Sequence, residues 1–150
     1  MESGNTPIQL LLAEDDHDDC LFFKEALQEV PLTSSLSIVN NGKELMQRLS
    51  DVSFVLPDII FLDLNMPRKS SLECLAEIKS DGRLKHIPVI ILSTSIDLDM
   101  AEVLHEKGAR YYIRKPGEFS KLKEIIFESI KTTLQDNIAQ PPKEKFILQP

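Results

Sequence analysis

The sequence is poor in several residue types that mark particular protein classes. It has no tryptophan, only five glycines and only two cysteines among its 150 residues. Cys20 and Cys74 form no CxxC pair, which argues against a disulfide framework or a zinc site, and we expect two buried thiols. No apolar run approaches the roughly 20 residues of a membrane span. Residues Met1 to Thr6 lack the basic and apolar regions of a secretory signal.

Positive charge is also in short supply. The chain has 17 Lys and Arg against 24 Asp and Glu, which gives a formal net charge of -7. Nonspecific nucleic-acid binding depends on Lys and Arg that neutralise phosphates, so this balance argues against such a partner. The hydrophobic content of 42% and charged content of 27% are ordinary for a globular domain. We therefore expect a cytoplasmic protein with neither a membrane nor a nucleic-acid partner.

Short apolar segments alternate along the chain with segments of helical periodicity. The expected strands are Ile8–Ala13, Leu36–Val39, Ile59–Leu62, Val89–Leu92 and Ala109–Ile113, and the last expected helix covers residues 118–134. Strands that are apolar at every position are typical of a parallel sheet covered on both faces. Since crossovers are right-handed, the pattern predicts an α/β fold, a doubly wound five-stranded parallel sheet with five helices.

Polar side chains follow the predicted strands, where a doubly wound sheet places its functional groups. Glu14, Asp15 and Asp16 follow the first strand, Asp63 ends the third, Ser93 ends the fourth and Lys115 follows the fifth. A solvated loop that caps the next helix would by itself explain the first three. Asp63 is harder to explain in that way, because a carboxylate at the end of a buried strand is poorly hydrated. Clustered carboxylates repel one another, and Mg²⁺ would relieve that repulsion.

A carboxylate beside Mg²⁺ can attack a phosphoryl group and form an aspartyl phosphate. Lys115 would be a second positive partner for that group, and the Ser93 hydroxyl could donate a hydrogen bond to one of its oxygens. The residues therefore predict a magnesium-dependent phosphoacceptor site around Asp63.

Four fragments of the sequence resemble the receiver domains of bacterial two-component signalling. They are LLAEDD at 11–16, LDLNMP at 62–67, ILST at 91–94 and YIRKP at 112–116. They occur in the family's order and spacing over roughly residues 7–134. The resemblance implies the flavodoxin-like receiver fold with strand order 2-1-3-4-5. It also implies a receiver domain over residues 1–134 and a C-terminal extension, or arm, over residues 135–150.

The resemblance assigns a role to each matching position. It implies Asp63 as phosphoacceptor, Asp15 as direct Mg²⁺ ligand, Glu14 as ligand through water, Asn65 as ligand through its backbone carbonyl, Ser93 as switch hydroxyl, Tyr112 as the aromatic that swings inward, and Lys115 as partner of the phosphoryl group. It also implies a cis Lys115–Pro116 bond. Ser71 departs from the family, because such loops usually carry glycine there. If the backbone at Ser71 were left-handed, the residue would be strained or the loop remodelled.

Within the family, LNMPRK at 64–69 and STS at 93–95 resemble the single-domain regulators paired with bacterial phytochromes and related histidine kinases. The implied function is transfer of a phosphoryl group to Asp63 from a sensor histidine kinase, and the narrower resemblance implies a kinase of phytochrome type. The signal would then pass to an unidentified downstream protein by conformational change or phosphorelay.

Two alternative functions stay open. One is a receiver that binds partners without phosphorylation. The other is an aspartate-nucleophile phosphohydrolase, but Asn65 stands where haloacid-dehalogenase-like enzymes have a second, titrating aspartate. We therefore expect that the chain is not an enzyme.

The end of the chain suggests contacts of its own. The apolar segment Phe146 to Leu148 would either pack on its own domain or dock on another subunit. The last long helix also has a broad apolar face between Phe119 and Leu134, and a homodimer through that face is a hypothesis.

Overall fold

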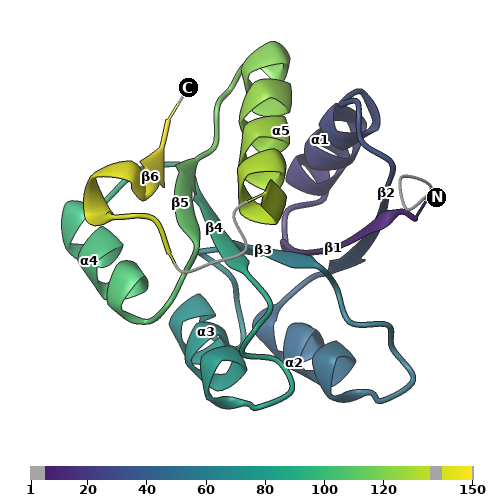
Figure 1. Ribbon diagram of the computed structural model, residues 1–150, viewed down its shortest axis with the longest axis vertical. Helices are drawn as coiled ribbons and strands as arrows, with labels where there is room; N and C mark the ends of the chain where they lie inside the picture. The colour runs from purple at the N-terminus through teal and green to yellow at the C-terminus, as the bar shows by residue number, and fades with distance from the viewer. Residues whose placement is uncertain (1–5, 136–139, 150) are drawn as a thin grey trace.

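The computed structural model describes residues 6–135 and 140–149, and most of the segment Met1 to Thr6 lies outside it. The strands are β1 (Ile8–Ala13), β2 (Ser34–Val39), β3 (Ile59–Asp63), β4 (Val89–Ser93), β5 (Tyr111–Arg114) and β6 (Ile147–Leu148). The helices are α1 (His17–Gln28), α2 (Gly42–Ser50), α3 (Ser71–Ser80), α4 (Leu98–Glu106) and α5 (Phe119–Gln135), followed by a short 3-10 turn at Lys143–Lys145. Strands and helices alternate through α5, as the sequence pattern predicts (Figure 1).

All strand pairs in the sheet are parallel, in the order β2-β1-β3-β4-β5-β6. The helices lie in two layers, with α1 and α5 over one face of the sheet and α2, α3 and α4 over the other (Figure 1). Neighbouring residues of a strand point to opposite faces, so Leu11 packs in the α2–α4 layer and Leu12 in the α1–α5 layer. Cys20 and Cys74 are buried free thiols, which confirms that prediction.

The sheet has six strands instead of the predicted five, because the C-terminal segment adds β6 to the free edge of β5. Ile147 pairs with Tyr112 and Leu148 with Ile113, and the Tyr112 N–H donates to the Phe146 carbonyl at 3.1 Å. A two-residue strand is too short to show a periodic pattern in the sequence. It forms because the edge of β5 offers backbone groups that need hydrogen-bond partners.

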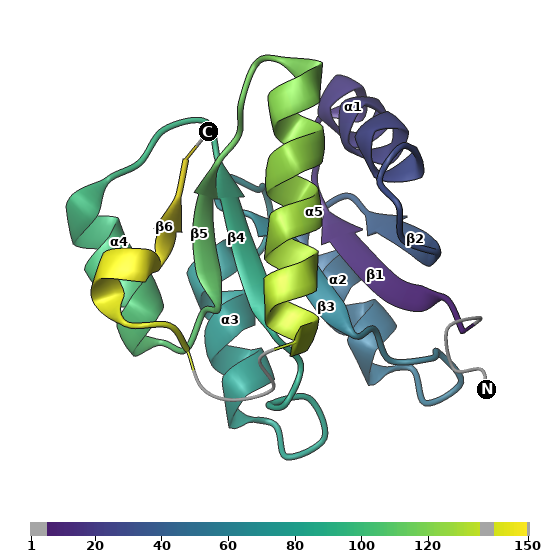
Figure 2. The same ribbon diagram turned by 45° about the horizontal axis from the view of Figure 1, so that its top comes forward.

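The C-terminal arm packs on its own domain, beside α4 and β5 (Figure 2). Phe146 is 2% exposed, and its ring lies edge-on to His105 at 5.0 Å and beside Tyr112 at 6.5 Å. At the start of the described arm, the Gln140 amide donates to the carbonyls of His105 and Ala109, each at 2.7 Å. The segment Phe146 to Leu148 is expected from the sequence either to pack on its own domain or to dock on another subunit, and the structure shows it packed on its own domain.

The predicted cis bond at Lys115–Pro116 is wrong, because the described residues contain no cis peptide bond. An X–Pro bond still favours trans by about 0.5–1 kcal/mol, and neighbouring residues decide the outcome. Within residues 6–135 and 140–149, no helix is long and apolar enough to cross a membrane.

Candidate metal and phosphorylation site

Three carboxylates meet where β1 and β3 end side by side. Ligand oxygens of Glu14, Asp15 and Asp63 all lie within 4.8 Å of one another. Glu14 is 2% exposed and Asp63 6% exposed, whereas Asp15 faces solvent. Their proximity follows from the sheet, because β1 and β3 are neighbours in register and both end at this edge. The structure thus brings together the three carboxylates that the sequence predicted as metal ligands.

Lys115 extends from the end of β5 across this edge to the carboxylates. Its Nζ atom lies 2.7 Å from Glu14 Oε1, 3.2 Å from Asp19 Oδ2 and 3.6 Å from Asp63 Oδ1. Its backbone is fixed to the neighbouring strand, since the Lys115 N–H donates to the Ser93 carbonyl at 2.7 Å. The lysine therefore partly neutralises the buried carboxylates.

The charges at this edge shift one another's protonation. Burial raises the pKa of Asp63 to about 7, Lys115 opposes that rise, and Glu14 adds to it. Burial alone would lower the pKa of Lys115, but the hydrogen bond to Glu14 and the charge of Asp63 outweigh it and raise that pKa. One cation thus leaves the carboxylate cluster under-neutralised, and a divalent cation would stabilise the charged form of Asp63.

The donor set fits a hard divalent metal ion. Mg²⁺ takes oxygen ligands, usually from one or two carboxylates together with water and phosphate. Glu14, Asp15 and Asp63 supply such oxygens, and the exposure of Asp15 leaves this side of the cluster open to solvent. Asn65, the predicted carbonyl ligand, is exposed in the loop after β3, and its backbone N–H donates to the Asp63 carboxylate.

Ser93, at the end of β4, and Tyr112 both contact the loop before α4. Ser93 is 2% exposed, and its Oγ accepts a weak hydrogen bond from the Ser95 N–H at 3.4 Å. Tyr112 is fully buried, and its hydroxyl donates to the Ser95 carbonyl at 3.4 Å and accepts from the Asp97 N–H at 3.3 Å. The hydroxyl of Tyr112 therefore contacts the β4–α4 loop and has no contact with the carboxylate cluster.

Two further acidic residues lie beside the carboxylate cluster. Asp16 caps α1, the role that the sequence offered as an alternative for this acidic loop, because its Oδ1 accepts from the Asp19 N–H at 2.9 Å. The sequence reasoning missed Asp19, whose carboxylate contacts Lys115. The available signal was its position in the first turn of the helix that follows the acidic loop, which places it close to that loop.

The fold and this group of side chains define a family. The profile of the response regulator receiver domain matches residues 10–127. The chain belongs to the response regulator receiver domain family.

Similar proteins include two response regulators, one of which is described as a phytochrome response regulator. Response regulator Rcp1 of Synechocystis sp. is 32% identical over 129 residues, which cover 83% of this chain and 88% of Rcp1. The crystal structure of the phosphorylated cyanobacterial phytochrome response regulator RcpA has a TM-score of 0.76 at 34% identity, covering 91% of this chain and 99% of RcpA. The structure of a Mn²⁺-bound form of Rcp1 has the same TM-score at 30% identity, covering 90% of this chain and 99% of that one.

Proposed function

We propose that this chain is a single-domain response regulator that accepts a phosphoryl group on Asp63 from a sensor histidine kinase, with Mg²⁺ bound by Asp15, Asp63 and the Asn65 carbonyl. Glu14 would bind the ion through water. The observation that carries the proposal is the cluster of three carboxylates beside Lys115, at the end of a buried strand. The likeness to Rcp1 and RcpA supports a phytochrome-type kinase as the phosphodonor.

In the proposed transfer, an Asp63 oxygen forms a bond to phosphorus while the P–N bond of the kinase phosphohistidine breaks, and its electron pair stays on the imidazole nitrogen. Bound Mg²⁺ would neutralise charge on the phosphoryl oxygens. Lys115 pairs with the phosphoryl group and Ser93 donates a hydrogen bond to it. The position of Lys115 supports this role, because its Nζ lies 3.6 Å from Asp63 Oδ1 before any transfer.

The transfer is tested by incubating the protein with Mg²⁺ and acetyl phosphate and then measuring its intact mass. We expect one phosphoryl adduct on the wild type and none on Asp63→Asn. We also expect no adduct on the wild type when EDTA is present during the incubation. Absence of the adduct, under conditions that label a known receiver, would favour the phosphorylation-independent binding module.

The proposed output is a shift of the β4–α4 loop. The Ser93 hydroxyl would move toward the phosphoryl group. The β4–α4 loop begins directly after Ser93, and the Tyr112 hydroxyl binds this loop at Ser95 and Asp97. Amide spectra with and without beryllofluoride, a phosphoryl mimic, should differ at residues 93–97 and at Tyr112. Identical spectra there would refute the switch even if Asp63 were modified.

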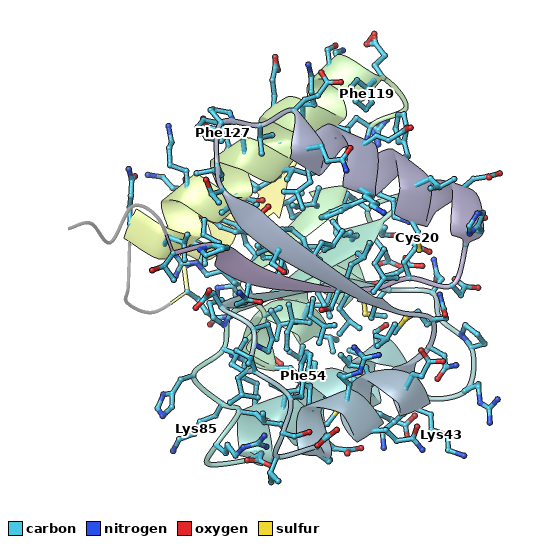
Figure 3. All side chains as sticks on the ribbon, turned by 90° about the vertical axis from the view of Figure 1, so that its right-hand side faces the viewer. Cys20, Lys43, Phe54, Lys85, Phe119 and Phe127 are labelled. Carbon is cyan, nitrogen blue, oxygen red and sulfur yellow. The ribbon has the colours of Figure 1, made fainter. Side chains whose placement is uncertain are left out.

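We further propose the division into a receiver domain of residues 1–134 and an arm of residues 135–150, in the cytoplasm. The packing of Phe146 against His105 of α4 and Tyr112 of β5 supports an arm that attaches to the domain at the edge of β5. The homodimer hypothesis concerns Phe119 and Phe127 on α5, which are half-buried (Figure 3). Light scattering of the wild type and of Phe127→Lys tests this hypothesis. Equal molar masses for the two proteins would exclude a homodimer through this face of α5.

A further inference from the structure

The buried hydroxyl of Ser71 closes the loop that carries the proposed metal ligand Asn65. Ser71 is the first residue of α3 and is fully buried. Its Oγ donates to the Asp63 carbonyl and lies 3.1 Å from the Leu64 carbonyl oxygen. The two carbonyls share a single hydroxyl proton. The hydroxyl therefore links the end of the loop after β3 to its beginning.

These carbonyls belong to the two peptide units that lead into Asn65, Asp63–Leu64 and Leu64–Asn65. Because a peptide unit is planar, fixing its carbonyl also fixes the direction of the N–H on its other side. The Asp63–Leu64 unit is held at both ends, by Ser71 Oγ at its carbonyl and by the Leu92 carbonyl, 2.8 Å from the Leu64 N–H. The Leu64–Asn65 unit has Ser71 Oγ at its carbonyl, and its N–H donates to the Asp63 carboxylate.

The rest of the loop is held closely against α2 and α3. A Cβ atom on Gly42 would lie only 2.2 Å from the Lys69 carbonyl, so this glycine lets the loop approach α2. At the other side, Ser70 and Glu73 form a reciprocal capping box at the start of α3. The left-handed residue in this segment is Arg68, with φ of 75°, whereas Ser71 is helical. Serine at position 71 is thus accommodated without a left-handed backbone.

We propose that Ser71 is a positioning residue for the metal site: its hydroxyl fixes the two peptide units that lead into Asn65, and so restricts where Asn65 can place its own carbonyl for the ion. This inference rests on the proposed function, since it assumes a metal bound at Asn65. Ser71 is not a ligand itself, because its hydroxyl is directed to backbone carbonyls.

The test compares Ser71→Ala with Ser129→Ala. Ser129 is a matched control, because it is also fully buried and donates to a backbone carbonyl, that of Ile126 at 2.9 Å, but it lies within α5. Both variants lose one buried hydrogen bond, so both should be less stable to urea. Mg²⁺ affinity, measured by calorimetry, should fall about tenfold in Ser71→Ala, as for other groups that orient metal ligands, and stay unchanged in Ser129→Ala.

A second readout needs no metal. Amide exchange measured by NMR should be faster at Asn65 in metal-free Ser71→Ala than in the wild type, and unchanged at Asn65 in Ser129→Ala. Ser71→Gly should behave like Ser71→Ala, and it serves as a second variant if alanine prevents folding.

Equal Mg²⁺ affinity and equal Asn65 exchange in the wild type and the Ser71 variants would overturn the inference. Equal losses in the Ser71 and Ser129 variants would also overturn it, because the effect would then be general destabilisation. Failure of the wild type to bind Mg²⁺ would instead count against the proposed function, while the metal-free exchange of Asn65 would still decide whether Ser71 orients the loop.

Discussion

Two half-buried lysines at opposite ends of the sheet have opposite electrostatic environments. Lys115, at the carboxyl end of β5, lies among Glu14, Asp19 and Asp63, and its pKa is raised. Lys79, on α3 near the amino end of β4, donates to the carbonyls of Lys85 at 3.3 Å and Ile87 at 3.1 Å, and burial lowers its pKa. Both side chains lose water, so the difference comes from their partners.

The hydrogen-bond partners also indicate a structural role for Lys79 and a chemical role for Lys115. Carbonyl groups satisfy the hydrogen bonds of an ammonium group but bring no net negative charge, so Lys79 only holds the turn before β4 together. The carboxylates around Lys115 bring more negative charge than one lysine neutralises. That excess of negative charge favours a divalent cation at the carboxyl edge, as the proposed function requires.

The largest expected difference is in phosphorylation by acetyl phosphate. Lys115→Met removes the cation beside Asp63 and should slow formation of the adduct by roughly 100-fold, the size of effect seen when one preorganised electrostatic partner of a reacting group is lost. Lys79→Met should leave that rate unchanged and lower the free energy of unfolding by about 1 kcal/mol, through two unmade hydrogen bonds near solvent.

Both quantities can be measured on the same samples, by intact mass against time and by urea unfolding. Similar rates for Lys115→Met and the wild type at saturating Mg²⁺ would mean that the metal alone neutralises the phosphoryl group. The two lysines would then differ in pKa but not in function.

The next effect concerns the pH dependence of stability in EDTA. Burial raises the pKa of Asp63 from 3.8 to about 7, so between these values the folded protein holds a proton that the unfolded chain has lost. Its contribution to stability is therefore complete below about pH 4 and is lost as the pH rises through 7. Between pH 5 and pH 8 about two pKa units separate the lower pH from the pKa of folded Asp63, so relative to wild type Asp63→Asn should gain on the order of 3 kcal/mol, at about 1.4 kcal/mol per pKa unit.

Urea unfolding of both proteins at pH 5 and pH 8 measures this gain directly. A difference between them that does not change with pH would contradict the raised pKa of Asp63, because folded and unfolded chains would then hold the same number of protons at this residue.

A smaller effect is expected at the other end of the sheet. Gly108 has φ of +96°, and a Cβ atom there would lie 3.4 Å from the Lys79 side chain. Gly108→Ala should lower the free energy of unfolding by roughly 1–2 kcal/mol, because alanine is strained in that backbone conformation. Acetyl phosphate labelling should stay at the wild-type rate. A slower rate would mean that this turn affects the carboxylate edge, so the surroundings of Lys79 and Lys115 would not be independent.

The smallest effect is expected at Arg68, which has φ of 75° in the loop after β3. Arg68→Gly relieves that strain but increases the freedom of the unfolded chain, so the net gain in stability should be about 0.5 kcal/mol or less. Arg68→Val, which tolerates the conformation worst, should be about 1 kcal/mol less stable than Arg68→Gly. Thermal unfolding of the pair measures this difference. Equal melting temperatures would mean that the loop rearranges around residue 68.

Much of the fold could be predicted because its signals are local. Residues 10–13 of β1, 59–62 of β3 and 89–92 of β4 are apolar at every position, which is typical of a sheet covered on both faces. The carboxylate edge could be predicted for a related reason: in parallel strands, residues that end different strands meet at one edge. Glu14, Asp63 and Lys115 follow from strand ends alone, without knowledge of any distance.

Other features depend on contacts between segments that are distant in sequence, and only the tertiary structure decided them. The strand β6 exists because β5 has a free edge, and Phe146 is buried because α4 and Tyr112 leave a place for its ring. Ser71 replaces the glycine that is usual in the family, and only the folded chain brings its hydroxyl to the Asp63 and Leu64 carbonyls. A sequence pattern shows which residues avoid water, but the partners of a buried hydroxyl or charge are chosen by packing, since only the folded chain brings them within hydrogen-bond distance.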